Sequence, residues 1–241
     1  MTEVPAIHVS GHYDIAYRRL FAPIDLALPA GQWVCLLGRS GVGKSTLLRL
    51  IAGLDGGGTF TGQITASDSQ PLAGRISFMA QSDLLLPWLT VLENTVLGAR
   101  LRESKPDLAR AEALLDRVGL STSREKKPAD LSGGMRQRAA LARTLMEDRP
   151  VALLDEPFSA LDASTRADMQ DLSAQMLKGK TVLMVTHDPA EAVRLGHQIV
   201  VLTSEGTELW QPPQTPPVRD QHVPETTACQ AALLSHLRGM R

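Results

Sequence analysis

The sequence predicts an α/β fold with a mostly parallel β-sheet, and three observations indicate this class. Apolar runs at 33–37 and 151–154 are typical of strands buried on both faces, and 181–185 is a third strand candidate. Helical patterns follow such runs, for example at 46–53 and 165–178, and regular alternation of this kind favours a parallel sheet with crossover helices. A length of 241 residues, 43% of them hydrophobic, suits one large domain, alone or with a small insert.

Three parts of the chain depart from this alternation. Short apolar runs separated by turn residues precede the first buried strand and predict an N-terminal antiparallel β region. Helical spacing dominates from 82 to 147, so we expect a helical subdomain inserted between core segments 1–81 and 148–210. The tail at 211–241 is rich in proline and polar residues. We expect it to be loosely packed and partly disordered, with a short helix over 229–237.

Composition excludes several classes of protein. A net charge of −1 provides no basic field for general nucleic-acid binding. Cys35 and Cys229 lie too far apart in the chain to suggest a metal site or a disulfide framework, and Cys35 falls in an apolar run typical of the core. Residues 1–10 lack a signal-peptide pattern, and no window approaches the ~18 apolar residues of a membrane span. If the protein works at a membrane, another subunit must hold it there.

A phosphate-binding loop follows the first buried strand. Residues 38–45 read G-R-S-G-V-G-K-S and match the pattern G-x-x-x-x-G-K-[ST] between a strand and a helix. The glycines let backbone N–H groups turn toward a phosphate, and the helix N-terminus adds partial positive charge. We expect Lys44 to bridge the β- and γ-phosphates and the Ser45 hydroxyl to bind Mg²⁺. The predicted nucleotide-binding residues here are Gly38, Arg39, Ser40, Gly41, Val42, Gly43, Lys44, Ser45 and Thr46.

Two acidic residues end the buried strand at 151–154. Acids at a strand end are often helix caps, but this strand should end beside the phosphate-binding loop, at the sheet edge where α/β proteins bind ligands. We expect Asp155 to hold Mg²⁺, through water, and Glu156 to act as general base toward the attacking water.

A third motif, L-S-G-G-M at 131–135, lies between the phosphate-binding loop and the L-L-D-E-P run at 153–157. With these motifs, roughly residues 5 to 210 resemble the nucleotide-binding subunit of an ABC transporter. The resemblance implies an ATPase with a P-loop NTPase core and ATP and Mg²⁺ as ligands. It also implies that Gln81 is the Q-loop glutamine, which touches the metal and senses the membrane subunit.

The resemblance assigns two further loops and a second subunit. Residues 159–162 match the D-loop, which runs along the dimer seam, and His187 matches the switch histidine that contacts the γ-phosphate. In the family each ATP lies between the P-loop of one subunit and the signature of the other, so Ser132, Gly133 and Gly134 imply a homodimer. The last signature position is usually Gln. Because the phosphate contacts come from a hydroxyl and backbone N–H groups, Met135 should matter little.

The aromatic residue that stacks on adenine is assigned to Tyr17, with Tyr13 as the alternative. The segment from Tyr17 to Gly31 is about two residues shorter than usual in the family. Either tyrosine could instead be an ordinary core residue.

The segment L-L-L-P-W-L-T-V-L-E-N at 84–94 resembles ATPases of importers for nitrate, sulfonates, taurine and thiamin-pyrimidine precursors. An exposed Pro87–Trp88 pair would form a groove for a partner helix, whereas a buried Trp88 would simply be core. The resemblance implies permease subunits as partners, an extracytoplasmic solute-binding protein acting indirectly, and no nucleic acid. It places the protein at the cytoplasmic face of the bacterial inner membrane, peripheral through the permease.

Other nucleotide-binding classes fit less well. Soluble ABC ATPases of DNA repair or translation typically carry a long coiled-coil insertion or two ATPase halves, which this sequence lacks. A GTPase would need an N-K-x-D-like element, and none is found. An exporter ATPase remains an alternative, although Pro87–Trp88 favours import. Because the ATPase does not touch the cargo, the cargo is assigned only through the subgroup resemblance.

Overall fold

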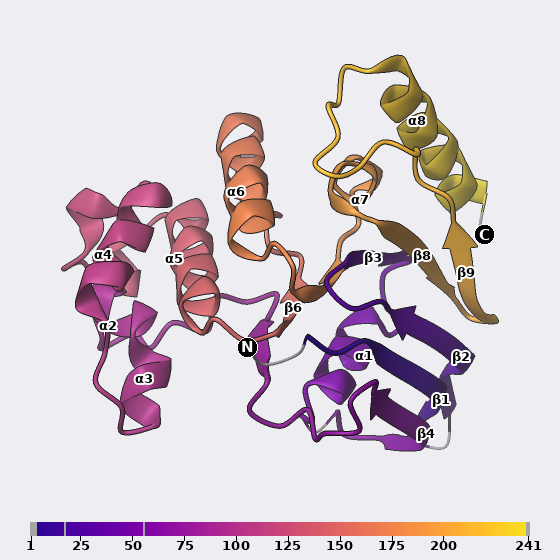
Figure 1. Cartoon of the computed structure of the whole chain (residues 1–241), viewed down its shortest axis with the longest axis horizontal. Coiled ribbons are helices and arrows are strands. Elements are labelled where there is room, and N and C mark those ends of the chain that lie inside the picture. Colours follow the sequence, from indigo (N-terminus) through magenta and orange to yellow (C-terminus); the bar gives the residue numbers. More distant parts are fainter. Residues whose placement is uncertain (1–3, 17, 55, 240–241) are drawn as a thin grey trace. The chain divides into compact units, whose positions relative to one another are not determined.

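The computed structural model describes residues 4–16, 18–54 and 56–239 (Figure 1). The chain divides into two compact units. The first comprises the residues up to Ile76, then Pro150–Glu156 and the residues from Lys178 onward. The second comprises Ser77–Arg149 and Pro157–Leu177.

This division differs from the predicted one in one segment. The helical insert expected over 82–147 lies within the second unit, but so does Pro157–Leu177, which the sequence assigned to the α/β core. The physical reason is a polar link inside the second unit. The side chain of Gln137 binds both Ser159 and Ala160, at the start of that segment.

The main sheet of the first unit has the order β6-β7-β3-β8-β9. Neighbouring strands are parallel except for the antiparallel pair β8 and β9, and β9 was not among the predicted strands. The buried strands consist almost wholly of apolar residues, as a sheet covered on both faces requires. The strand bounds are β3 Trp33–Gly38, β6 Val151–Asp155, β7 Thr181–Val185, β8 Gln198–Thr203 and β9 Gly206–Trp210, and a short β5 at Ile76–Met79 spans the boundary between the units.

A smaller antiparallel sheet of order β2-β1-β4 forms the predicted N-terminal β region. In β1, alternate residues Ile7, Val9 and Tyr13 are buried, which is the period-2 pattern of a strand with one covered face. The strands are β1 Ile7–Ile15, β2 Arg18–Leu28 and β4 Thr59–Ala66. With the parallel sheet, this region confirms the predicted fold class.

The helices of the first unit are α1 Lys44–Ile51, α7 Pro189–Leu195 and α8 Pro224–Gly239. Figure 1 shows α8 beside α7, and the two helices are in contact. The tail therefore differs from the loosely packed segment that we expected. The reason is Arg219, whose buried guanidinium binds backbone carbonyls at the C-terminal end of α7.

Helix α5 is the centre of the second unit and contacts α2, α4 and α6. Its buried face consists mainly of alanine and leucine, which allows neighbouring helices to approach closely. The helices are α2 Val91–Thr95, α3 Leu97–Leu101, α4 Leu108–Arg117, α5 Gly133–Met146 and α6 Ala163–Met176, with 3₁₀ turns at Ser121–Ser123 and Pro128–Asp130. Within the described residues, no helix combines the length and apolar character needed to cross a bilayer.

Candidate functional site

The phosphate-binding loop joins β3 to α1, as predicted. Gly43 is the N-cap of α1 and has φ +107°, a backbone conformation that favours glycine. A Cβ atom at Gly43 would lie 2.8 Å from the Phe21 ring, so a larger residue would also be excluded by its neighbours. At Gly43 the loop therefore has a backbone shape that favours glycine, directly before a helix N-terminus.

Lys44 is buried at the start of α1. Its Nζ donates hydrogen bonds to the carbonyl oxygens of Gly38, at 2.9 Å, and Arg39, at 3.0 Å. Burial lowers the pKa of Lys44, while the nearby carboxylates of Glu156 and Asp155 act in the opposite direction. The ammonium group is thus held inside the loop, close to both acidic residues.

Asp155 ends β6 and is buried. Burial raises the pKa of its carboxyl group, and a hydrogen bond with Ser45 opposes this rise. Among the described residues, Asp155 Oδ1 has no hydrogen-bond partner. A buried carboxylate oxygen without a partner, beside a serine hydroxyl, is an oxygen donor set of the kind that Mg²⁺ prefers. The residues present therefore fit the ion that the sequence predicts.

Glu156 and His187 face each other at the ends of adjacent strands β6 and β7. Glu156 Oε2 lies 3.2 Å from His187 Nδ1. The backbone N–H of Glu156 donates to the carbonyl oxygen of Val185, at 2.9 Å, so the residue is tied to the neighbouring strand. Glu156 also has φ +48°, an uncommon conformation outside glycine and one that is found at functional sites. The structure thus brings two separately predicted site residues into contact.

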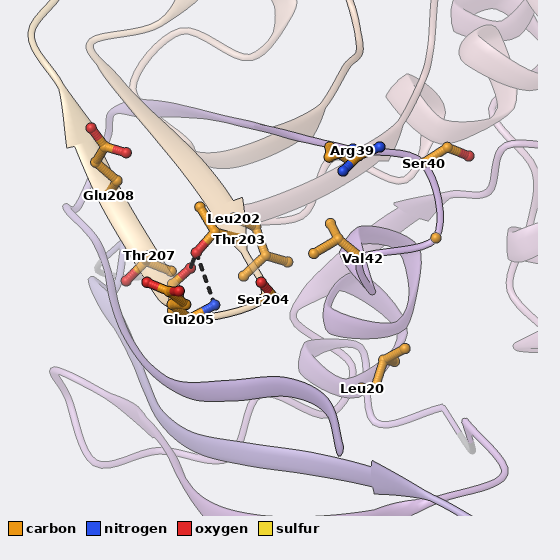
Figure 2. Close-up of a pocket in the computed structure, with 12 residues that line it drawn as sticks. Leu20, Arg39, Ser40, Val42, Leu202, Thr203, Ser204, Glu205, Thr207 and Glu208 are labelled. Atoms are coloured by element: carbon orange, nitrogen blue, oxygen red, sulfur yellow. Dashed lines mark hydrogen bonds between the residues drawn. The ribbon is translucent and has the colours of Figure 1, made fainter. Parts of the chain in front are cut away.

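A cavity of about 650 Å³ opens beside the phosphate-binding loop, within the first unit. Figure 2 shows Arg39, Ser40 and Val42 on one side and the turn between β8 and β9 on the other. The turn is closed by Thr203, whose hydroxyl group donates to the Gly206 carbonyl oxygen and accepts the N–H of Glu205. The loop thus borders open space of a size typical of small-molecule sites.

The signature residues lie in the second unit, at the start of α5. Ser132 is the N-cap of this 14-residue helix, and its Oγ accepts the backbone N–H of Met135, at 3.3 Å. A Cβ at Gly134 would lie 3.2 Å from the carbonyl oxygen of Ala160, so glycine allows the close approach of this segment. Gly133 is exposed beside it. The motif therefore presents a hydroxyl group at the positive end of a helix.

Gln137 is a site residue that the sequence did not predict. It is buried one turn into α5, where its Oε1 accepts the Ala160 N–H, at 2.7 Å. Its Nε2 donates to the Ser159 hydroxyl, at 3.2 Å. Gln137 thereby fixes the predicted D-loop to the signature helix. The sequence feature that could have pointed to Gln137 is its position about one helical turn after the signature motif.

Gln81 follows β5 and is exposed, in the second unit. Basic residues of α5 hold the segment after it. Arg143 donates to the carbonyl oxygens of Asp83, at 2.6 Å, and Leu84, at 2.7 Å. Arg136 pairs with the Asp83 carboxylate, at 3.2 Å. The role of Gln81 at the metal stays a prediction.

A turn in the second unit presents Trp88. Asn94 is buried, and its side-chain oxygen accepts the Leu86 N–H, at 2.8 Å. Its side-chain amide also donates to the carbonyl oxygens of Leu86, Leu89 and Thr90. The turn is thus held from within, while Trp88 remains 65% exposed. Trp88 is not a core residue of this unit.

The predicted adenine-stacking residue Tyr17 lies outside the described residues. The alternative, Tyr13, is 2% exposed and packs against Phe21, with ring centroids 6.0 Å apart. Its hydroxyl group accepts the N–H of Gly58, at 2.9 Å. Tyr13 is therefore a core residue with no ring face open to a base.

Comparisons with known proteins point to one family. A family model described as "ABC transporter" matches residues 21–159. An uncharacterized ABC transporter ATP-binding protein from Haemophilus influenzae is 47% identical over 192 residues, which are 79% of this chain and 78% of that protein. The aliphatic sulfonates import ATP-binding protein SsuB 2 of Agrobacterium fabrum is 48% identical over 183 residues, 74% of this chain and 68% of that protein.

A solved structure agrees with these sequence matches. It is the dimeric structure of a post-hydrolysis state of the ATP-binding cassette MJ0796 bound to ADP and Pi, with a TM-score of 0.73 and 29% sequence identity. The match covers 89% of this chain and 99% of the solved chain.

Proposed function

Because the chain belongs to the ABC transporter family, as an ATP-binding subunit with ATPase activity, we propose that it powers a bacterial importer. The transported solute is a small sulfonate or a related compound such as taurine, nitrate or a thiamin-pyrimidine precursor. Relatives named as aliphatic sulfonate import proteins support the sulfonate assignment. The subunit works as a homodimer at the cytoplasmic face of the inner membrane, where it is attached to a permease. An extracytoplasmic solute-binding protein delivers the solute to that permease.

The phosphates of ATP are bound by the loop between β3 and α1. The backbone N–H groups after Gly38 and the N-terminus of α1 favour negative charge, and Lys44 adds a cation at the same place. Ser45 and Asp155 would hold Mg²⁺, which when bound neutralises charge on the phosphate oxygens. The cavity beside Val42 supplies space for the base and ribose.

Hydrolysis is assigned to Glu156 and His187, and their contact at 3.2 Å is the observation that carries the proposal. Glu156 takes a proton from water as the water oxygen attacks the γ-phosphorus, and the bond from that phosphorus to the β–γ bridging oxygen breaks, which releases ADP. His187 donates a hydrogen bond to the γ-phosphate. Its side chain is 65% exposed and so is accessible to the nucleotide.

The position of Ser132 supports the proposed homodimer. The N-terminus of a 14-residue helix with an exposed serine is suited to an anion, and family resemblance assigns that anion to the ATP of a second subunit. An interface of this kind is two-fold symmetric, so two equivalent composite sites form. ATP-driven closure and reopening after hydrolysis then give the two states that a transporter needs.

The permease is proposed to dock on the surface around Trp88. Trp88 is 65% exposed and Leu84, four residues earlier in the chain, is 60% exposed; large apolar side chains left in water are typical of protein interfaces. The Asn94 hydrogen bonds hold this turn without burying Trp88. A membrane partner that covers the ring would explain both features.

The activity is tested with Glu156→Gln in the full chain. Removing a general base lowers turnover by about 10²- to 10⁴-fold, whereas the phosphate-binding loop is unaltered and ATP should still bind. ATP binding without hydrolysis should leave a dimer detectable by light scattering. Glu103→Gln makes the same chemical change at an exposed site and serves as control. Turnover of Glu156→Gln equal to wild type, or a strictly monomeric variant with ATP, would contradict the proposal.

The cargo needs a separate test in cells. A strain that lacks the gene should lose growth on an alkanesulfonate as sole sulfur source, and the wild-type gene should restore it. Sulfate should support growth in both cases. Loss of growth on nitrate or taurine instead would reassign the cargo within the subgroup, and no growth defect on any of these compounds would reject the subgroup.

A further inference from the structure

A buried hydrogen bond lies directly behind the switch histidine. Thr186 and Glu191 are both buried, and the Thr186 hydroxyl donates to Glu191 Oε2, at 2.6 Å. Thr186 is the first residue after β7, and Glu191 lies in the first turn of α7. A carboxylate is expensive to bury unless hydrogen bonds compensate it, so this arrangement ties the end of the strand to the helix that follows.

The same hydroxyl also fixes the other side of the histidine. Thr186 Oγ1 accepts the backbone N–H of Asp188, at 3.0 Å, and Asp188 caps α7 through the N–H of Ala190, at 2.8 Å. The backbone N–H of Thr186 donates to the carbonyl oxygen of Leu36 on β3, at 3.2 Å. Both neighbours of His187 in the chain are therefore held by hydrogen bonds, and the histidine side chain projects from a fixed backbone.

We propose that the Thr186–Glu191 hydrogen bond positions His187, so that its ring reaches Glu156 and the γ-phosphate in one defined orientation. Thr186 and Glu191 are positioning residues, because they act through His187 and do not themselves touch the nucleotide. This inference rests on the function proposed above for His187. Sequence motifs do not single out either residue, and the pairing is visible only in the folded chain.

Loss of this hydrogen bond should affect turnover more than nucleotide binding. Thr186→Val removes the hydroxyl group at nearly constant shape, which leaves the Glu191 carboxylate and the Asp188 N–H without that partner. His187 then has more backbone freedom and spends less time in the productive geometry. Because small errors in the position of a reacting group are costly in rate, we expect kcat to fall by about tenfold or more. KM for ATP should stay within about twofold of wild type, since the phosphate-binding loop is unaltered.

Thr181→Val is a matched control. The Thr181 hydroxyl is also buried, donates to the carbonyl oxygen of Pro5, at 2.6 Å, and accepts the N–H of Gly31, at 3.1 Å. It begins the strand β7 that Thr186 follows, so both variants lose a threonine hydroxyl with one donated and one accepted hydrogen bond. Both should lose thermal stability, but only Thr186→Val should lose kcat.

The experiment measures kcat and KM of the full chain with Mg²⁺ and ATP for these variants, alone and combined with His187→Ala. We expect Thr186→Val to reduce kcat in the wild-type background and to add less than twofold in the His187→Ala background. Thr186→Ser, which keeps the hydroxyl, should recover most of the loss. Glu191→Gln keeps an acceptor oxygen without the charge, so its kcat should lie between those of Thr186→Ser and Thr186→Val. It also provides a second test of the hydrogen bond if Thr186→Val does not fold.

The outcomes separate the two proposals. If His187→Ala turns over like wild type, the role proposed for His187 is wrong, and the inference fails with it. If His187→Ala is impaired while Thr186→Val keeps wild-type kcat, only the inference is overturned. The inference is also overturned if Thr181→Val loses kcat equally, if Thr186→Ser is as impaired as Thr186→Val, or if the Thr186→Val and His187→Ala effects multiply.

Discussion

Replacing Arg219 with alanine should destabilise the protein, because this side chain fastens the C-terminal tail to α7. Arg219 is 5% exposed, and its guanidinium donates to the carbonyl oxygens of Val193 and Gly196, each at 2.7 Å, and of Pro213, at 3.0 Å. Removing the donor leaves three carbonyl groups without it. Each buried polar group left unsatisfied costs about 1–3 kcal/mol.

Burial of the charge offsets part of this stabilisation. Burial lowers the pKa of Arg219, and within the described residues its Nε has no hydrogen-bond partner. The alanine variant no longer has to desolvate a cation. The net loss of unfolding free energy should therefore be smaller than the summed cost of three unsatisfied carbonyl groups. We expect the free energy of unfolding to fall by about 2–4 kcal/mol. For a chain of this size that corresponds to a decrease in Tm of roughly 4–16 °C.

Thermal unfolding with and without limited proteolysis measures this effect. The segment between Trp210 and α8 should be cut faster in Arg219→Ala, since the tail loses its attachment to α7. Arg238→Ala, at an exposed arginine of α8, should change Tm by less than about 2 °C. The Tm of Arg219→Lys should lie between those of wild type and Arg219→Ala, because an ammonium group lacks the planar, forked donors of a guanidinium group. A Tm for Arg219→Ala within about 2 °C of wild type would refute the reasoning.

Two further predictions concern the second unit. Gln137→Leu leaves the Ala160 N–H without the acceptor that now binds it at 2.7 Å. Tm should therefore fall by roughly 2–12 °C in thermal unfolding, and turnover should drop in an ATPase assay. An unchanged Tm would show that this link is unimportant. Trp88→Asp places a charge on the proposed permease surface and should lower co-purification with the permease at least tenfold. Leu209→Asp, at an exposed apolar residue of the first unit, should retain the permease, and equal losses in both variants would argue against a specific surface.

The catalytic motifs could be predicted because their geometry is encoded locally. Gly43 must adopt positive φ where the loop enters the helix, and Asp155 must end a buried strand, so short sequence patterns specify both positions. The alternation of apolar runs likewise specified the parallel sheet. The partners of single polar residues carry no such pattern. Gln137 and Arg219 bind backbone groups that are distant in the sequence, and only the folded chain reveals those contacts.

The burial of Tyr13 could have been predicted from the sequence. This residue shares the parity of Ile7 and Val9 in a strand with alternating burial, so period 2 alone places it on the covered face. The docked tail is a different case, since its proline-rich composition resembles that of disordered segments. Here the tail is held by Arg219, which binds carbonyls at α7, and by the contact between α8 and α7.

Helix α7 connects the switch loop to the tail, and its length makes it dependent on both. A helix of seven residues is not stable by itself, so its contacts must hold it. Glu191 ties its first turn to Thr186, and Arg219 binds the carbonyls of Val193 and Gly196 at its other end. If α7 responds as one unit, Thr186→Val and Arg219→Ala should be non-additive in the free energy of unfolding, with a coupling of about 0.5–3 kcal/mol. Additive effects would mean that each end of α7 is held independently of the other.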